Sequence, residues 1–350
     1  MISANFNIHN ILKINFIWYK KYRSILKGLD LKLDYFSVND VKNPDITVEI
    51  GPFSPDLKDC RVYERKFFVK ENFAYANGGS WRRKWAVQIS GLDEDKLIVK
   101  LNAEARNLRG FIVPNMIIDN LILPLLELKF PEKGYMLIHS GAVSKNENGY
   151  LLVGRGGSAK TSIVMDLIRK YDYKYVGDDR VLIGLDKSLM SFPTYLQIFE
   201  FLLKRSKTEV MSLFTKLRLI SYLLNKKSPR IAVADRSNLS GVILLMPSNN
   251  PYAVKRLSEE KSVGRIMLNI LMEYFEMCRI VGLDICPVFE CIMAYSAAFP
   301  NSKVSKIQDR LESYLKTALR GLPIYEVSIP IQYRDGVADV INNLIEGEMS

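Results

Sequence analysis

Short apolar segments of strand character dominate the first third of the chain. Four of them are enriched in β-branched and aromatic side chains, at residues 46–50, 66–70, 85–89 and 96–101. Turn-forming sequences separate them, at Gly51-Pro52, Asn77-Gly78-Gly79 and Gly91. Short runs between turn signals predict an antiparallel β meander. We therefore expect a β-rich N-terminal region over residues 1–130.

From residue 131 onward, strand-like and helix-like segments alternate. Strands are predicted over residues 135–143, 150–153, 173–176, 241–246 and 324–329. Apolar residues at helical spacing predict helices over residues 112–128, 163–170, 258–275, 302–319 and 335–346. Pro124 is expected to kink or divide the first of these helices. The alternation predicts an α/β domain over residues 131–350.

Residues 196–227 form a long segment that is both apolar and basic. Its apolar residues recur at helical spacing, which leaves two interpretations open. The segment either packs helices against the core with a solvated basic face, or lies on a membrane or an acidic partner.

Composition is that of an ordinary globular protein, with 48% apolar and 25% charged residues. No run is long enough to span a bilayer, and Lys13 interrupts the N-terminal apolar stretch, so we expect a cytoplasmic protein without a signal peptide. The net charge of +11 favours anionic partners or serves solubility. The basic residues are too dispersed for a dedicated nucleic-acid surface.

The chain has four cysteines without a CxxC pair and two histidines, which disfavours a zinc site. The cysteines are expected to be buried thiols.

A glycine-rich loop follows the apolar run that ends at Val153. It reads Gly154-Arg155-Gly156-Gly157-Ser158-Ala159-Lys160-Thr161-Ser162, and a helical segment follows. Strand, glycine loop, Lys-Thr and helix is the layout of a phosphate-binding loop, and these nine residues are the candidate nucleotide contacts. Ala159 stands where the consensus has its second glycine. We expect weaker or altered phosphate binding from that alanine rather than none.

The chemistry of a nucleotide triphosphate explains these residue types. Glycines let backbone N–H groups approach the phosphates, and the following helix adds its positive end. Lys160 is expected to reach the β- and γ-phosphates, and the Thr161 hydroxyl to contact Mg²⁺. Arg155, Arg180 and Arg230 are weaker candidates for phosphate or substrate contacts.

Asp178 and Asp179 follow the strand predicted at residues 173–176. Carboxyl ends of neighbouring strands share one crevice in an open α/β sheet, so the pair is expected to face the loop. One carboxylate can then hold Mg²⁺ while the other accepts a proton. Asp178 and Thr161 are the candidate metal contacts, and a solvated turn is the alternative for the pair. His139, on the preceding strand, is either structural or a site residue.

Three motifs in this order resemble the C-terminal domain of HPr kinase/phosphorylase and its wider family of P-loop kinase-like proteins. They are Ile138-His139-Ser140-Gly141, the loop from Gly154 to Thr161, and Tyr175-Val176-Gly177-Asp178-Asp179-Arg180-Val181. The resemblance is dense over about residues 135–185. It implies a P-loop α/β core akin to that of phosphoenolpyruvate carboxykinase and ATP–Mg²⁺-dependent phosphorylation of a serine hydroxyl.

The resemblance also implies roles for particular residues. Lys160 and Thr161 correspond to phosphate and magnesium contacts, the pair Asp178 and Asp179 to the catalytic base and metal partner, and His139 to a site residue. The downstream segment used for phosphorolysis has no counterpart, so that activity is not expected, and HPr is not assumed to be the substrate.

The leading hypothesis is an ATP- and Mg²⁺-dependent kinase acting on a serine-type hydroxyl of a protein, peptide or small molecule. The alternative is a non-catalytic nucleotide-binding sensor or maturation accessory protein. A nucleic-acid-associated ATPase is a third class, suggested by net charge alone. Assembly into a homo-oligomer is compatible with all three.

Overall fold

The computed structural model describes residues 1–19, 33–80, 83–105, 121–194, 196–203, 231–249, 252–279, 287–331 and 336–349. Helices accompany two large mixed β-sheets, which confirms the α/β class. The chain divides into two compact units. Unit 1 comprises Met1–Gly134 and Tyr274–Ser313, and unit 2 comprises Tyr135–Glu273 and Tyr314–Ser350. Residues 274–313, which the sequence analysis placed in the C-terminal domain, thus group with unit 1.

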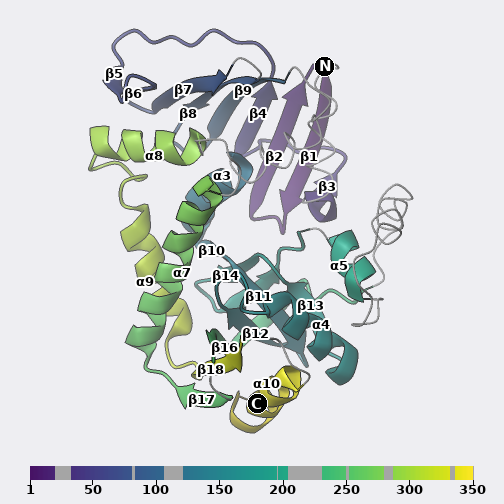
Figure 1. Ribbon diagram of the computed structural model, residues 1–350. Coiled ribbons are helices and arrows are strands. Elements are labelled where there is room, and N and C mark those ends of the chain that lie inside the picture. The colour runs from purple at the N-terminus through teal and green to yellow at the C-terminus, as the bar shows by residue number, and fades with distance from the viewer. Residues whose placement is uncertain are drawn as a thin grey trace. The chain divides into compact units, whose positions relative to one another are not determined.

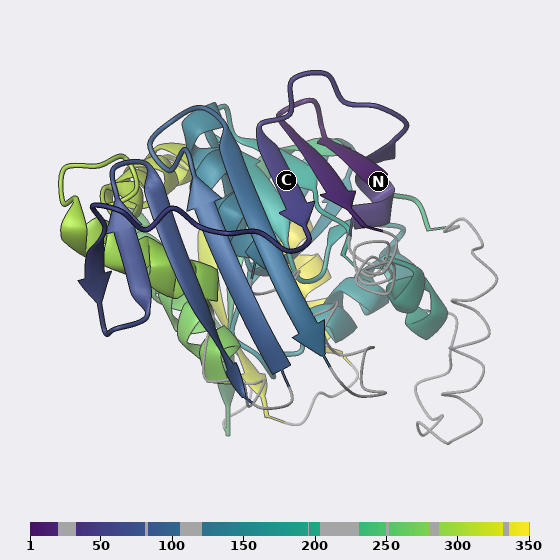
Figure 2. The same cartoon turned by 90° about the horizontal axis from the view of Figure 1, so that it is seen from above.

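A nine-stranded sheet organises unit 1. Its strands are β1 (Ile2–Ile8), β2 (Leu12–Trp18), β3 (Ser37–Val38), β4 (Ile46–Ile50), β5 (Arg61–Tyr63), β6 (Phe67–Lys70), β7 (Phe73–Ser80), β8 (Arg83–Ser90) and β9 (Leu97–Ala105). The purple and blue strands lie side by side in the order β3-β1-β2-β4-β9-β8-β7-β6-β5 (Figures 1 and 2). Strands β5 to β9 form an antiparallel meander that includes three of the four predicted segments, in β6, β8 and β9, together with β5 and β7, which were not predicted. The fourth predicted segment, β4, was expected in the same meander but pairs in parallel with both β2 and β9.

Two features of this sheet correct the sequence analysis. The hairpin of β1 and β2 was not predicted, although β2 alternates strictly: Leu12 and Ile14 are buried while Lys13 between them is not. The turn predicted at residues 77–79 is wrong, because these residues lie inside β7. Gly78 faces the ring of Trp85 on β8, and a Cβ there would come within 2.6 Å of that ring. The glycine makes room for an aromatic side chain rather than for a turn.

The helices of unit 1, and the two helices whose residues are divided between the units, agree only in part with the sequence analysis. Helix α3 (Leu123–Lys129) carries Pro124 in its first turn, where proline is well tolerated, and the kink or division expected at Pro124 stays a prediction. Residues 112–120 of that predicted helix lie outside the described part of the chain. Helix α8 (Pro287–Ala298) was not predicted, and it packs on β6 and β7. The predicted helices at 258–275 and 302–319 are confirmed as α7 (Glu259–Arg279) and α9 (Ile307–Leu319).

The sheet of unit 2 contains β10 (Tyr135–Ile138), β11 (Ser140–Lys145), β12 (Asn148–Val153), β13 (Lys174–Gly177), β14 (Val181–Gly184), β15 (Ser188–Ser191), β16 (Arg236–Ser248), β17 (Ala253–Arg256) and β18 (Ile324–Pro330). Their order is β10-β14-β15-β16-β12-β11-β13, and β18 pairs with both β16 and β17. The single strand predicted at residues 135–143 is instead two strands that separate at His139. One pairs with β14, and the other with β12 and β13.

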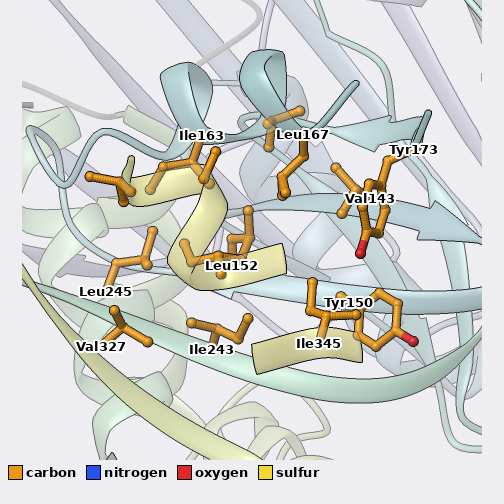
Figure 3. Packing of buried hydrophobic residues seen from close by; sticks show 14 of the residues in the cluster. Val143, Tyr150, Leu152, Ile163, Leu167, Tyr173, Ile243, Leu245, Val327 and Ile345 are labelled. Carbon is orange, nitrogen blue, oxygen red and sulfur yellow. The ribbon is translucent and has the colours of Figure 1, made fainter. Parts of the chain in front are cut away.

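Helices α4 (Lys160–Tyr171) and α10 (Val337–Leu344) contact each other and share the main core of unit 2 with a π-helical turn, Ile345–Met349. Figure 3 shows this packing, in which side chains of α4 and the π-helical turn meet side chains of β12, β16 and β18: Ile163, Leu167, Ile345, Leu152, Ile243, Leu245 and Val327. Helix α5 (Leu196–Leu203) adds Leu196 and Phe199 to the same core. This favours the core-packing interpretation for the part of residues 196–227 that is described.

Two smaller expectations concern cysteines and membranes. Cys291 is a buried free thiol, as expected, whereas Cys60 is a free thiol that is only half-buried. None of the described helices combines the length and the apolar content that crossing a bilayer requires.

The core of unit 2 predicts the effect of shortening one of its side chains. Leu152 is fully buried, so Leu152→Ala should lower the free energy of unfolding by about 2–5 kcal/mol through lost burial and a residual cavity. Urea denaturation measures this. The matched control is Leu268→Ala on α7, where the side chain is 60% exposed and a change within about 0.5 kcal/mol is expected. Equal effects of the two substitutions would contradict the packing.

Candidate functional site

Strand pairing brings three of the sequence motifs to one edge of the unit 2 sheet. Strand β11 lies between β12 and β13 and is antiparallel to both, so β12 and β13 run in the same direction. Ser140 pairs with Val153 at the end of β12, and Ala142 pairs with Gly177 at the end of β13. The glycine loop, the Asp178–Asp179 pair and His139 therefore all lie at this edge.

The glycine loop connects β12 to α4 through a tight turn. Ser158 N–H donates to the Arg155 carbonyl at 3.0 Å. A Cβ on Gly154 would come within 2.5 Å of the Ser158 hydroxyl, and Gly157 has a left-handed φ of +83°. Around Gly156 and Gly157, no atom of the described residues lies within 4 Å of an added Cβ. The first glycine is thus required by packing, while the other two border open space.

Ala159 lies at the N-cap of α4 in the left-handed conformation, with φ 60° and ψ 19°. For a residue with a Cβ this conformation costs about 1–2 kcal/mol, whereas glycine adopts it freely. The physical reason for a glycine at this consensus position is therefore backbone conformation. Crowding of the phosphates by one methyl group is not needed to explain it.

Lys160 begins α4 and is buried, with its ammonium turned back into the loop. Nζ donates to the Gly154 carbonyl at 2.5 Å and contacts the Arg155 carbonyl at 3.3 Å.

Thr161 and Ser162 follow in the first turn of α4, half-buried. No side chain of the described residues caps this turn. The buried Ser158 hydroxyl, which is 1% exposed, has no hydrogen-bond partner among them either. Uncapped helix N–H groups, a hydroxyl and an ammonium together suit an anion.

The Asp178 carboxyl is held by Tyr175 of β13, whose hydroxyl donates to Oδ1 at 2.7 Å. Burial raises the pKa of Asp178 to about 7, and the charge of Asp179 adds to this effect. The Tyr175 hydrogen bond and the charge of Lys160 lower the same pKa. Burial, and then the charge of Asp178, raise the pKa of Tyr175 well above its ordinary value. Asp178 is thus a carboxyl that exchanges its proton near neutral pH.

His139 and Arg180 surround Asp179. His139 Nδ1 lies 3.3 Å from Asp179 Oδ1, and Arg180 Nη1 contacts His139 Nδ1 and donates to the Asp179 carbonyl at 3.2 Å. A guanidinium group only donates and a carboxylate only accepts, so Nδ1 accepts from Arg180 in the tautomer without a proton on it and donates to Asp179 in the tautomer that carries one. His139 therefore supports the turn that carries Asp179, with its Nδ1 already engaged.

Two residues missed by the sequence analysis position the acidic pair. Tyr175 holds Asp178, and its place on the strand, at the start of the third motif, gave no indication of that role. Gly177 ends β13, and a Cβ there would come within 2.3 Å of the Arg180 carbonyl oxygen and 2.7 Å of Val181. Only glycine allows the tight passage from β13 through the pair. Its place immediately before Asp178 was the available signal.

The three arginine candidates differ in their surroundings. Arg155 is exposed within the loop, and Arg180 is buried, with its side chain 3% exposed beside His139. Arg230 lies outside the described residues.

The residues present fit a nucleotide with magnesium. Among the described residues, no group of three or more acidic, histidine or cysteine side chains is arranged to hold a metal ion. Mg²⁺ in phosphoryl-transfer sites needs no such cage, because it keeps waters and binds one or two protein oxygens together with substrate phosphates. Thr161 and a carboxylate of the acidic pair supply oxygens of that kind.

Neither the protein-family models nor the curated proteins searched contain a match to this chain.

The conformation of Ala159 predicts a stabilising substitution. Ala159→Gly removes the left-handed penalty but adds flexibility to the unfolded chain, so we expect a net gain of about 0.5–1 kcal/mol in the free energy of unfolding. The control is Ala338→Gly in α10, where glycine should cost about 1 kcal/mol or more, because helix propensity and the burial of the methyl group are both lost. Thermal or urea denaturation compares the two. A loss of stability for Ala159→Gly would contradict the left-handed assignment.

The pKa of Asp178 predicts how stability depends on pH. The carboxyl of an aspartate in an unfolded chain has a pKa of about 3.9. In the folded protein the pKa of Asp178 is about 7, so Asp178 keeps its proton to a higher pH. Between these values the folded protein binds more protons, so the contribution of Asp178 makes the free energy of unfolding fall as pH rises. Asp178→Asn should remove this decline. Denaturation at several pH values measures it, and an unchanged slope in the variant would show that another group titrates.

Proposed function

We propose that this protein is an ATP- and Mg²⁺-dependent phosphotransferase of the HPr-kinase-like class that phosphorylates a serine-type hydroxyl. The observation that carries the proposal is the meeting of the glycine loop, Lys160 and the acidic pair at one sheet edge. A phosphate-binding loop alone serves many nucleotide-binding proteins. Carboxylates beside it are what transfer to a hydroxyl requires, because the hydroxyl must lose its proton. A P-loop core of the HPr-kinase and phosphoenolpyruvate carboxykinase type belongs to the same proposal.

Each residue has a task in this proposal. The loop N–H groups and Lys160 bind and orient the triphosphate, with Lys160 exchanging its loop carbonyl contacts for phosphate oxygens. Bound Mg²⁺ would neutralise phosphate charge, held by Thr161 and one carboxylate of the pair. The other carboxylate accepts the hydroxyl proton, a task suited to a group whose pKa lies near the working pH. Tyr175 orients Asp178, and His139 with Arg180 orients Asp179.

A non-catalytic nucleotide sensor or maturation accessory protein is the second candidate. Two observations favour it: the strained backbone at Ala159, and the hydrogen bonds that hold Lys160 on loop carbonyls. Lys160 must leave these carbonyls before it can contact a transferring phosphate, so both features suit a loop that binds nucleotide without turning it over. ATP binding without phosphoryl transfer to any hydroxyl acceptor would favour this candidate.

Substitution of Lys160 tests nucleotide binding and turnover together. Lys160→Ala should weaken Mg²⁺–ATP binding in calorimetry and reduce phosphoryl transfer about 100-fold or more, as loss of a charged transition-state contact does. The matched control is Lys170→Ala on the same helix, where the lysine is exposed and its Nζ lies 3.1 Å from Oδ1 of half-buried Asp339. Equal ATP affinity of both variants would contradict the proposed phosphate site.

Asp178→Asn and Asp179→Asn assign the two carboxylate tasks. The proton acceptor should lose about 100-fold to 10,000-fold in turnover with ATP affinity retained, since general-base catalysis contributes that much. Its partner should instead show a raised Mg²⁺ requirement. The proposal fails if both variants keep full turnover.

A further inference from the structure

A cavity of about 200 Å³ opens beside the acidic pair in unit 2. Its polar side is formed by Asp178, Asp179 and Thr194, and its apolar side by three residues of α5: Ile198, Phe199 and Leu202. Two carboxylates therefore border a space with one apolar wall. Such a combination of apolar lining and a few polar groups is typical of small-molecule sites.

The apolar wall is tied to the rest of the site through named contacts. Arg169 of α4 donates to the carbonyls at the end of α5, from Nε to Leu203 at 2.8 Å and from Nη2 to Leu202 at 3.0 Å. On the other side, the Phe199 ring lies 4.6 Å from the Tyr175 ring, and Tyr175 donates to Asp178. A continuous series of contacts thus connects α4, which follows the glycine loop, through α5 to the acidic pair.

The hydroxyl of Thr194 is a further polar group in the lining of this cavity. The residue is 2% exposed, and its hydroxyl has no hydrogen-bond partner within the described part of the chain. A buried hydroxyl without a partner is destabilising, and a bound molecule or water that pairs with it removes this cost. A ligand oxygen placed between Thr194 and the carboxylates would satisfy it.

We propose that this cavity is the acceptor site, and that the acceptor is a small alcohol with a short apolar body. This rests on the proposed function. A cavity of about 150 Å³ holds benzene in another protein, so about 200 Å³ accepts an apolar body of roughly six to eight atoms. The hydroxyl lies at Thr194 and the acidic pair, and the apolar body lies against α5.

The transfer balances with the groups present and ATP. The acceptor oxygen forms a bond to the γ-phosphorus, and the bond from that phosphorus to the bridging oxygen breaks, so that ADP leaves with its electron pair. The hydroxyl proton passes to a carboxylate of the pair. A phosphorylated alcohol and ADP are the products.

Binding of probe alcohols to the full chain tests the ligand class without nucleotide. Benzyl alcohol is the probe, toluene lacks the hydroxyl, and glycerol lacks the apolar body. Ligand-detected NMR titration should show benzyl alcohol binding more tightly than glycerol. Thr194→Val should weaken the binding of benzyl alcohol about 3-fold to 10-fold, because one hydrogen bond is lost, and should leave the binding of toluene unchanged.

A cavity-filling substitution completes the experiment. Leu202→Trp should weaken the binding of benzyl alcohol at least about 10-fold, because the larger side chain occupies the space that the ligand needs. Leu268→Trp, at a 60% exposed position, is the control for the added ring. Equal binding by glycerol, or benzyl alcohol binding that resists both Thr194→Val and Leu202→Trp, would overturn the inference. Thermal denaturation verifies that each variant is folded.

Phosphoryl transfer is measured separately, so the two proposals can fail independently. Alcohol binding that depends on Thr194 and Leu202, together with no ATP binding, would uphold the ligand class and reject the phosphotransferase. Transfer to polar seryl peptides as fast as to benzyl alcohol would uphold the phosphotransferase and overturn the apolar acceptor.

Discussion

The antiparallel pairing of β11 with both β12 and β13 is the constraint on which the site depends. It forces two strands that are separated by α4 to end at the same edge of the sheet. Each of these ends then passes into a segment that requires glycine, Gly154 after β12 and Gly177 at the end of β13. A one-residue shift in the pairing of β11 would turn its side chains to the opposite face and separate these segments.

Several features that cost folding free energy lie at the same edge of the sheet, and packing in the core has to offset that cost. Asp178 is a carboxyl kept in a desolvated place, Ala159 holds a left-handed backbone, and the hydroxyls of Ser158 and Thr194 are buried without partners among the described residues. Strain and desolvation of this kind cluster at functional sites and persist when the surrounding structure holds them in place. The cluster of side chains under α4 and α10 provides that support.

Much of the site's framework could be predicted from sequence because its signals are local. The run of apolar residues before Gly154, the Lys160-Thr161 pair and the helical spacing of Ile163 and Leu167 define strand, loop and helix without tertiary information. The break at His139 could not be predicted, since the apolar run 135–143 reads as one strand and only pairing with different neighbours divides it. Gly78 misled the prediction for a related reason, because its role depends on Trp85 of the next strand. The role of Tyr175 and the cavity beside α5 likewise depend on residues far apart in sequence.

The central claim is that the glycine loop and the acidic pair form one site, and a carboxyl titration tests it most directly. Carbon-13 NMR of labelled aspartate, assigned with Asp178→Asn, measures the pKa of Asp178 with and without Mg²⁺–ATP. The account predicts a pKa of about 7 in the free protein. It predicts a marked fall when Mg²⁺–ATP binds, because a nearby cation favours the ionised carboxylate. An ordinary pKa in the free protein, or one that Mg²⁺–ATP binding leaves unchanged, would contradict it.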